Sequence, residues 1–330
     1  MKRHSTPGIG AFVGAAAALL TVAFVGSAPA DTYDETPPAI SVPAPEPAPP
    51  PPAPVEEPKK KALRYVPPVA QPIFNEPAQI TTEIRPIYIY HEIPNSFPSD
   101  GGTVHAIAVQ LRAAITERLA FIATKDGWMD IKFDNTLKDE DGFLNIAAGF
   151  KYAVLSDPEN DTFVTVGLRY EAPTGNLKTA VKGVADSDIT LQGNGDGMID
   201  VFVTGTRPIG EKAAIQASLG YDGAIDSDKN SSFLHASIHG DYEIVKNLYG
   251  ILELSMIATA DNGDEIDIGS FEGEDVFNFG NEDSDTIFPF AVGARYRVTD
   301  NFILGTAYEF PLDHKDITQQ RVYVDAVLHF

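Results

Sequence analysis

Residues 321–330 read RVYVDAVLHF, and this stretch alternates strictly in twos. One face carries only apolar residues, namely Val322, Val324, Ala326, Leu328 and Phe330. The other face is mixed, with Tyr323, Asp325, Val327 and His329. Successive side chains of a β-strand point to opposite faces, so the pattern predicts a strand with one apolar and one partly charged face.

Similar strand-like segments recur along the chain from residue 85 onward. Segments rich in β-branched and aromatic residues are bounded by Gly, Pro, Asn or Asp, which is typical of strands separated by turns. We expect twelve strands, at residues 86–93, 104–115, 119–131, 143–155, 162–172, 199–206, 213–222, 233–245, 248–258, 287–298, 302–311 and 322–330.

The connections between these strands alternate in length. Short ones fall at residues 116–118, 156–161, 207–212, 246–247 and 299–301, and longer polar ones at 132–142, 173–198, 223–232 and 259–286. Short turns at one end and long loops at the other indicate a membrane β-barrel rather than a soluble β-sandwich. The sequence therefore predicts an all-β, up-and-down antiparallel transmembrane barrel of about 12 strands.

With its even strand number and its amphipathic closing strand ending in Phe330, the chain resembles bacterial outer-membrane β-barrels of the porin or transporter kind. The resemblance covers residues 85–330. It implies an outer-membrane location and contact with outer-membrane lipids. It also implies that Phe330 is an assembly signal for the barrel-assembly machinery.

The first 84 residues have a different composition. Residues 1–30 combine Lys2 and Arg3, an Ala-rich apolar core and the sequence Ala28-Pro29-Ala30, which indicates a signal peptide. Residues 31–84 are punctuated by proline, which opposes helix and sheet, so we expect a disordered periplasmic linker before the barrel at 85–330. A further hypothesis is that this linker reaches the cell wall or a partner.

The overall composition of the chain argues against several kinds of site and partner. The chain has no cysteine, which removes disulfides and thiolate metal sites. Its formal net charge of −23 argues against a nucleic-acid partner. No phosphate loop, dinucleotide fingerprint or zinc-protease motif occurs in the sequence.

The faces opposite the apolar stripes carry charges of both signs, which we expect to line the lumen. Two interpretations are open: a polar channel that selects solutes, or charge pairs that close a narrow interior. The candidate binding and selectivity residues are Arg112, Lys151, Arg169, Glu171, His235, His239, Asp241, Glu253, Arg295, Arg297, Glu309 and Asp325.

One strand places Ser237 between His235 and His239 on a single face. Ser–His pairs can hydrolyse esters, and some twelve-stranded outer-membrane phospholipases are similar in having Ser and His. Here the residues lie opposite Leu234, Ala236 and Ile238, so we expect them in the lumen, and no catalytic residue is assigned. The protein is not expected to be an enzyme, and a lipid hydrolase is the alternative.

Two further features concern cations. Residues 193–200 resemble the middle of an EF-hand loop, so Asn194, Asp196 and Asp200 are candidate calcium ligands, although Gln192 and Val203 break the pattern. Residues 261–285 are densely acidic and contain no Lys or Arg. Apart from this possible calcium, no cofactor is expected.

The sequence thus predicts passive passage of small solutes across the outer membrane, with acidic external loops favouring cations. The other alternative is a non-conducting structural barrel that anchors a periplasmic tether.

Overall fold

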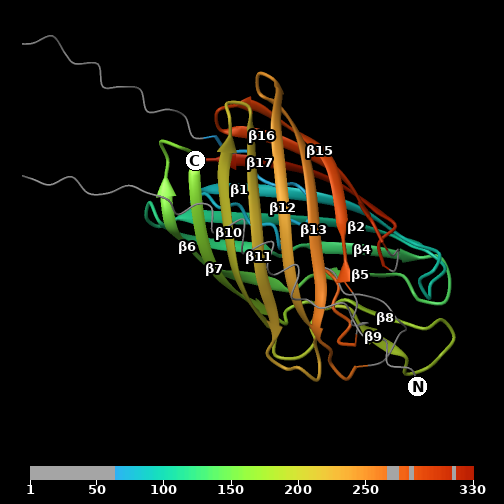
Figure 1. Ribbon diagram of the computed structural model, residues 1–330. Coiled ribbons are helices and arrows are strands. Elements are labelled where there is room, and N and C mark those ends of the chain that lie inside the picture. The colour runs from blue at the N-terminus through green and yellow to red at the C-terminus, as the bar shows by residue number, and fades with distance from the viewer. Residues whose placement is uncertain (1–63, 266–274, 282–285, 314–316) are drawn as a thin grey trace, which may run out of the picture. The chain divides into compact units, whose positions relative to one another are not determined.

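The computed structural model describes residues 64–265, 275–281, 286–313 and 317–330. These residues form a closed antiparallel β-barrel, drawn in Figure 1 with its strands running side by side around one interior. Among the described residues, no helix is long and apolar enough to cross a membrane.

Twelve barrel positions are filled by fifteen strands, because three positions are each divided into two short strands. The barrel strands are β1 (Glu83–Ile93), β2 (Gly102–Ala114), β3 (Leu119–Lys125), β4 (Trp128–Phe133), β5 (Glu140–Phe143), β6 (Ile146–Asp157), β7 (Thr162–Ala172), β10 (Met198–Ile209), β11 (Ala213–Ala224), β12 (Ser232–Val245), β13 (Leu248–Asp261), β14 (Thr286–Ile287), β15 (Pro289–Thr299), β16 (Phe302–Pro311) and β17 (Gln320–His329). In addition, β8 (Lys178–Ala180) and β9 (Asp188–Thr190) form a separate hairpin in the loop between β7 and β10.

The barrel closes through β17, the strand formed by the C-terminal stretch of the chain. Strand β17 pairs with β16 on one side and with β1 on the other, in the register Ile87↔Asp325 and Tyr88↔Val324. Closure leaves no exposed sheet edge, which a strand-built membrane span requires because lipid cannot hydrogen-bond to the backbone. The predicted twelve-strand barrel is therefore confirmed.

Three predicted strands are interrupted, at residues 119–131, 143–155 and 287–298. Residues 119–131 were expected as a single strand, but β3 ends at Lys125 and β4 starts at Trp128. Gly127 has φ +118°, and a Cβ at this position would lie 2.4 Å from the carbonyl oxygen of Ile107. A side chain does not fit this break, which explains why apolar residues fail to alternate across it.

The outward and inward faces follow the predicted alternation. In β7, Val166, Leu168 and Tyr170 are exposed, whereas Thr165 and Arg169 are buried. Leu144 is an exception: continued alternation along the predicted strand 143–155 would place it on the outer face with Ile146 and Phe150, but it is 4% exposed in the interior. It lies in the gap between β5 and β6, where its N–H donates to the carbonyl of Gly127 (3.0 Å), so the period of two is broken there.

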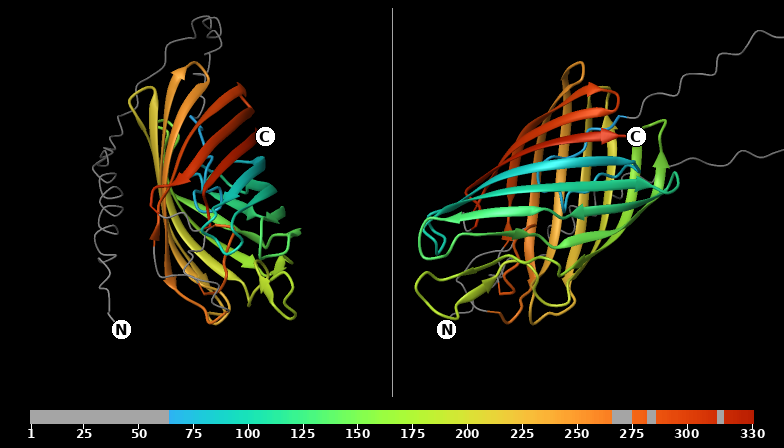
Figure 2. Two further views of the ribbon diagram at one scale, coloured as in Figure 1. Left: turned by 90° about the vertical axis from the view of Figure 1, so that its right-hand side faces the viewer. Right: turned by 180° about the vertical axis from the view of Figure 1, so that it is seen from behind.

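The interior of the barrel is occupied by the chain itself. Residues 64–82, hereafter the plug, precede β1 and are largely buried within it (Figure 2, blue). Arg64 lies beside the β10–β11 turn, with its guanidinium donating to the carbonyl of Lys212 (2.9 Å). The plug turns back at Gln71–Asn75 and reaches Thr82, whose carbonyl accepts from the N–H of Phe330 (3.1 Å). Both ends of the plug therefore lie at the short-turn end of the barrel.

This placement revises part of the predicted linker. Residues 64–82 were expected as irregular chain outside the barrel, but they belong to the same compact unit as the strands. They are irregular as predicted, with four prolines at 67, 68, 72 and 77. The predicted signal peptide and the rest of the linker fall on residues 1–63, outside the described residues.

We expect a charge on the outer face of β7 to destabilise the barrel. Leu168 is 55% exposed at the centre of the strand, where it would contact hydrocarbon. Leu168→Arg should lower the free energy of unfolding in lipid vesicles by about 2–4 kcal/mol, the cost of a cation near the bilayer midplane. Leu168→Ala serves as the control, and an equal effect of both variants would contradict lipid exposure of this face.

Candidate functional site: the plugged lumen

The predicted lumen residues do face the interior. Eleven of the twelve are buried and Arg297 is half-buried. They do not line an open polar channel, because most of them bind the plug or one another. The second interpretation of the charged faces, pairing that closes the interior, describes this structure.

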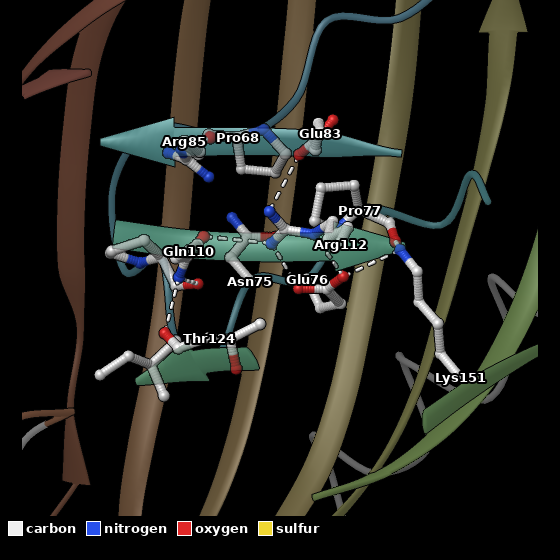
Figure 3. Close-up of polar contacts among 12 residues, drawn as sticks. Pro68, Asn75, Glu76, Pro77, Glu83, Arg85, Gln110, Arg112, Thr124 and Lys151 are labelled. Atoms are coloured by element: carbon white, nitrogen blue, oxygen red, sulfur yellow. Dashed lines mark hydrogen bonds and ion pairs between the residues drawn. The ribbon is translucent and has the colours of Figure 1, made fainter. Parts of the chain in front are cut away.

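Glu76 is the charged centre of the plug (Figure 3). Its carboxylate accepts two hydrogen bonds from Arg112 of β2, from Nε (2.8 Å) and Nη2 (2.6 Å). Lys151 of β6 donates to the same carboxylate (2.8 Å) and to the carbonyl of Pro77 (2.7 Å). Arg112 also binds Glu83 at the start of β1 (2.9 Å). Side-chain exposure is 0% for these charged groups, so none of them has water as an alternative partner.

Burial by itself would raise the pKa of Glu76, because a buried carboxylate loses its hydration. The positive charges of Arg112 and Lys151, together with their hydrogen bonds, outweigh that effect and hold the pKa well below its usual range. Glu76 is therefore ionised wherever the barrel is folded at ordinary pH.

A second charged group holds the first half of the plug. Asp325 of β17 accepts from Arg295 (2.8 and 2.9 Å) and from Arg85 (2.6 Å). Each arginine also donates from Nη2 to the carbonyl of Pro68, at 2.7 Å from Arg295 and 2.8 Å from Arg85. Nε of Arg295 donates to the carbonyl of Pro67, whereas Nη1 of Arg85 has no hydrogen-bond partner among the described residues. Prolines present carbonyls that no strand competes for, so they suit recognition by guanidinium groups.

Two carboxylates bind the next residues of the plug. Glu253 of β13 accepts from the N–H groups of Val69 (2.8 Å) and Ala70 (2.7 Å), and also from His239 (2.7 Å). Glu309 of β16 accepts from the side-chain amide of Gln71 (3.0 Å). Glu253 thus fixes the backbone of the plug, whereas Glu309 binds the side chain of Gln71.

On β7, Arg169 pairs with Asp200 of β10 and donates to the carbonyl of Ile73 (2.5 Å). His235 of β12 also binds Asp200 (2.9 Å), and the ring of Phe74 stacks on it with centroids 4.3 Å apart. Glu171, a neighbour on β7, pairs with Lys125 (2.8 Å) rather than with the plug.

The short-turn end of the lumen is held by two arginines. Arg64 pairs with Asp241 of β12, and Arg297 of β15 donates to the carbonyl of Tyr65 (2.9 Å). The contacts of all twelve candidate lumen residues have now been described.

The Ser–His stripe on β12 faces the lumen as predicted. Ser237 shares its hydrogen bond with the hydroxyl of Ser255 (2.9 Å), not with either histidine. His235 and His239 instead bind Asp200 and Glu253. A nucleophilic serine needs a base within hydrogen-bonding reach, so this arrangement does not support the hydrolase.

The candidate calcium ligands do not converge. Asp200 is committed to Arg169 and His235 inside the barrel, whereas the side chain of Asn194 donates to Thr190 in the external loop. The carbonyl of Asp196 accepts from Tyr170. Across the part of the chain that the structure describes, no group of three or more potential metal ligands is found.

The acidic segment 261–285 is described in part. Glu265 pairs with Lys229 (2.5 Å) and Asp275 with Arg321 (2.9 Å). The carboxylates at 267, 272, 274, 282, 283 and 285 lie outside the described residues.

Above the plug, on the long-loop side, lies an apolar chamber of about 240 Å³. Four phenylalanines frame it, with Phe97 and Phe133 stacked at 6.4 Å and Phe277 and Phe279 at 6.0 Å. The remaining lining is Ile93, Pro98, Thr136, Leu137, Thr179, Val181, Ile189, Leu191 and Ile317. Only two of the thirteen lining residues carry a polar side-chain atom, so the chamber favours an apolar occupant.

The chamber and the plug share one apolar cluster. Ile73 and Phe74, at the turn of the plug, belong to the same buried cluster as Phe97, Phe133 and Phe277. The top of the plug is therefore part of the packing beneath the chamber.

Comparison with known proteins supports the fold. No protein-family model matches the sequence, and the search of curated proteins gave no match. Among solved structures, the COG4313 outer membrane channel from Pseudomonas putida F1 is similar, with a TM-score of 0.53 and 14% identity over 81% of this chain and 100% of that one.

Other similar structures share less of the geometry. The NanC porin has a TM-score of 0.43 and 8% identity, over 76% of this chain and 99% of that one. The β domain of the Bordetella autotransporter BrkA has a TM-score of 0.46 and 10% identity, over 76% of this chain and 100% of that one. The likeness to the COG4313 channel shows that the chain has the β-barrel fold seen in bacterial outer-membrane proteins. At these identities the likeness concerns the fold alone, and no subfamily is assigned.

Sequence reasoning missed several charged residues of the site, among them Glu76, Glu83, Arg85 and Arg321. The first two lie in segments read as linker, and Arg85 and Arg321 fall just before predicted strands. A usable signal was present, because Glu76 is the single charge between Arg64 and Glu83 in a segment otherwise rich in proline and apolar residues.

Removing the charge of Glu76 should loosen the plug. Glu76→Gln leaves Lys151 without a carboxylate and Arg112 with only Glu83, and an unpaired buried charge costs about 3–5 kcal/mol. We expect larger and more frequent conductance steps in planar bilayers than for the unmodified protein. Glu117→Gln, on the exposed β2–β3 turn, is the matched control. Identical traces for both variants would show that Glu76 does not retain the plug.

The plug should also resist mild acid. Because the folded-state pKa of Glu76 is depressed, its contribution to stability is present above the unfolded value of about 4.3 and is lost only as pH falls through the lower folded value. Conductance of the unmodified protein should therefore be equal at pH 7 and pH 4. Opening with a midpoint between pH 4 and 5 would contradict this assignment.

Proposed function

We propose that this protein is an outer-membrane channel whose chamber admits small, mainly apolar molecules and whose plug closes the lumen until it moves. The apolar chamber is the observation that supports this proposal most directly. It is large enough for a molecule of one or two rings, and burial of apolar surface would supply the binding free energy.

The state of the lumen supports a closed rather than freely open channel. Hydrophilic solutes crossing it would have to displace the plug residues that bind Arg85, Arg112, Lys151 and Arg295. Paired charges of this kind produce little transverse field, so they do not supply the ion selectivity that an open lumen would have.

The proposed setting is the outer membrane, with the short turns and the plug entrance on the periplasmic side. Acidic external loops would raise the local cation concentration at the outer mouth, as the sequence predicts. Movement of the plug distinguishes this function from the purely structural barrel, in which residues 64–82 would stay in place.

Occupancy of the chamber can be tested by fluorescence of 1-aminonaphthalene with the protein in lipid nanodiscs. We expect a saturable blue-shifted emission, which should weaken by about tenfold or more for Val181→Asp because a carboxylate would enter an apolar cavity. Val184→Asp is the matched control, since Val184 is 53% exposed and outside the lining.

Equal binding by the two valine variants, or no saturable binding to the unmodified protein, would overturn the proposal. Empty nanodiscs give the contribution of partition into lipid.

A further inference from the structure

A row of small hydroxyl side chains crosses the inner wall of the barrel. Thr165, Thr204, Ser218, Ser237 and Ser255 are direct cross-strand neighbours on β7, β10, β11, β12 and β13. All five are buried, with exposures between 0% and 5%. This hydroxyl row faces the second half of the plug, since Thr165 donates to the carbonyl of Ala78 (2.5 Å).

Several polar atoms along this wall have no protein partner among the described residues. They are the hydroxyls of Thr204 and Ser218 in the row itself, the side-chain nitrogen of Asn75 on the plug, Nδ1 of His235 and Nε2 of His239. Asn75 lies at the row because its side-chain oxygen accepts from Gln216 of β11 (3.2 Å), two residues from Ser218. Buried polar groups are almost always hydrogen-bonded, so these atoms indicate bound water.

Two small cavities lie at either end of this wall. One is lined by Phe74, Arg169, Asp200 and Asp222, four residues along β10 and β11 from the row. The other lies on the opposite side of the row, where Gln216, His239 and Asp241 line it beside Arg64. Each measures about 10 Å³, close to the space that one water molecule requires.

The charged contacts of the plug come from strands other than β10 and β11. Arg85, Arg112, Lys151 and Arg295 bind it from β1, β2, β6 and β15. Arg169 of β7 donates to the carbonyl of Ile73, and Asp241 of β12 pairs with Arg64. From β10 and β11, the contacts of the plug among the described residues are the neutral hydrogen bonds with Gln216. Neutral hydrogen bonds are roughly half as strong as charge-assisted ones, so the plug separates most easily from β10 and β11.

We propose that a hydrated seam runs between the plug and the hydroxyl row, and that water passes the plug along it while the plug is in place. This inference rests on the proposed channel function and specifies the route that water takes past the closed plug. The seam joins the cavity below Phe74 to the cavity beside Arg64, and therefore connects the region under the chamber to the short-turn end.

Thiol labelling tests the route, because the chain contains no cysteine and a single substitution creates a unique thiol. Ser218→Cys places it in the seam. Ala307→Cys, on β16, places it where Val69 and Ala70 pack against the wall, away from the row. Both positions are buried, at 5% and 2% exposure, so burial alone does not separate them. The reagent is 2-sulfonatoethyl methanethiosulfonate, applied to barrels whose heat-modifiable gel mobility shows that they are folded.

We expect Ser218→Cys to react faster than Ala307→Cys by about tenfold, which corresponds to a difference of roughly one hydrogen bond in the free energy of access. Equal rates, a faster reaction at Ala307→Cys or no reaction at Ser218→Cys would each overturn the seam. Binding of 1-aminonaphthalene reports on the chamber separately, so failure of the route can be distinguished from failure of the proposed function.

Discussion

Every charge inside this barrel must find a partner, because neither lipid nor bulk water reaches it. Glu76 meets that requirement for Arg112 and Lys151 at once, and Asp325 meets it for Arg85 and Arg295. Arg85, Lys151 and Arg295 also donate to carbonyls of the plug. The strands and the plug are therefore interdependent: the wall alone would carry buried, underpartnered cations, which are strongly destabilising.

This dependence explains why an irregular, proline-containing segment lies in the interior of a β-barrel. Residues such as Pro67, Pro68 and Pro77 cannot donate backbone hydrogen bonds, but their carbonyls accept from long cationic side chains. The wall supplies arginine and lysine where the plug offers oxygen, and the carboxylate of Glu253 where Val69 and Ala70 offer N–H groups. Backbone polarity therefore contributes to the complementarity of plug and wall, together with the carboxylate of Glu76 and the apolar packing of Ile73 and Phe74.

Period-two alternation was sufficient to predict the barrel, its strand number and the inward direction of residues such as Arg169 and Asp325. It failed at Leu144 and in the segment around Gly127, where breaks in the hydrogen-bond ladder reset the period. It could not predict the plug, since Glu76 acquires its role only from Arg112 and Lys151, residues distant in sequence. The chamber could not be predicted either, because its phenylalanines come from three separate parts of the chain: the β1–β2 loop, the end of β4 and the loop before β14.

The plug continues directly into β1, and the carbonyl of Thr82 is bonded to Phe330 at the point where the barrel closes. A plug that leaves the lumen therefore remains tethered to the rim. Its return is an intramolecular event, for which short flexible connections give effective concentrations on the order of millimolar. Reclosure needs no second molecule and does not depend on protein abundance. Such a gate resets itself after each passage, and only the opening step requires an external supply of free energy.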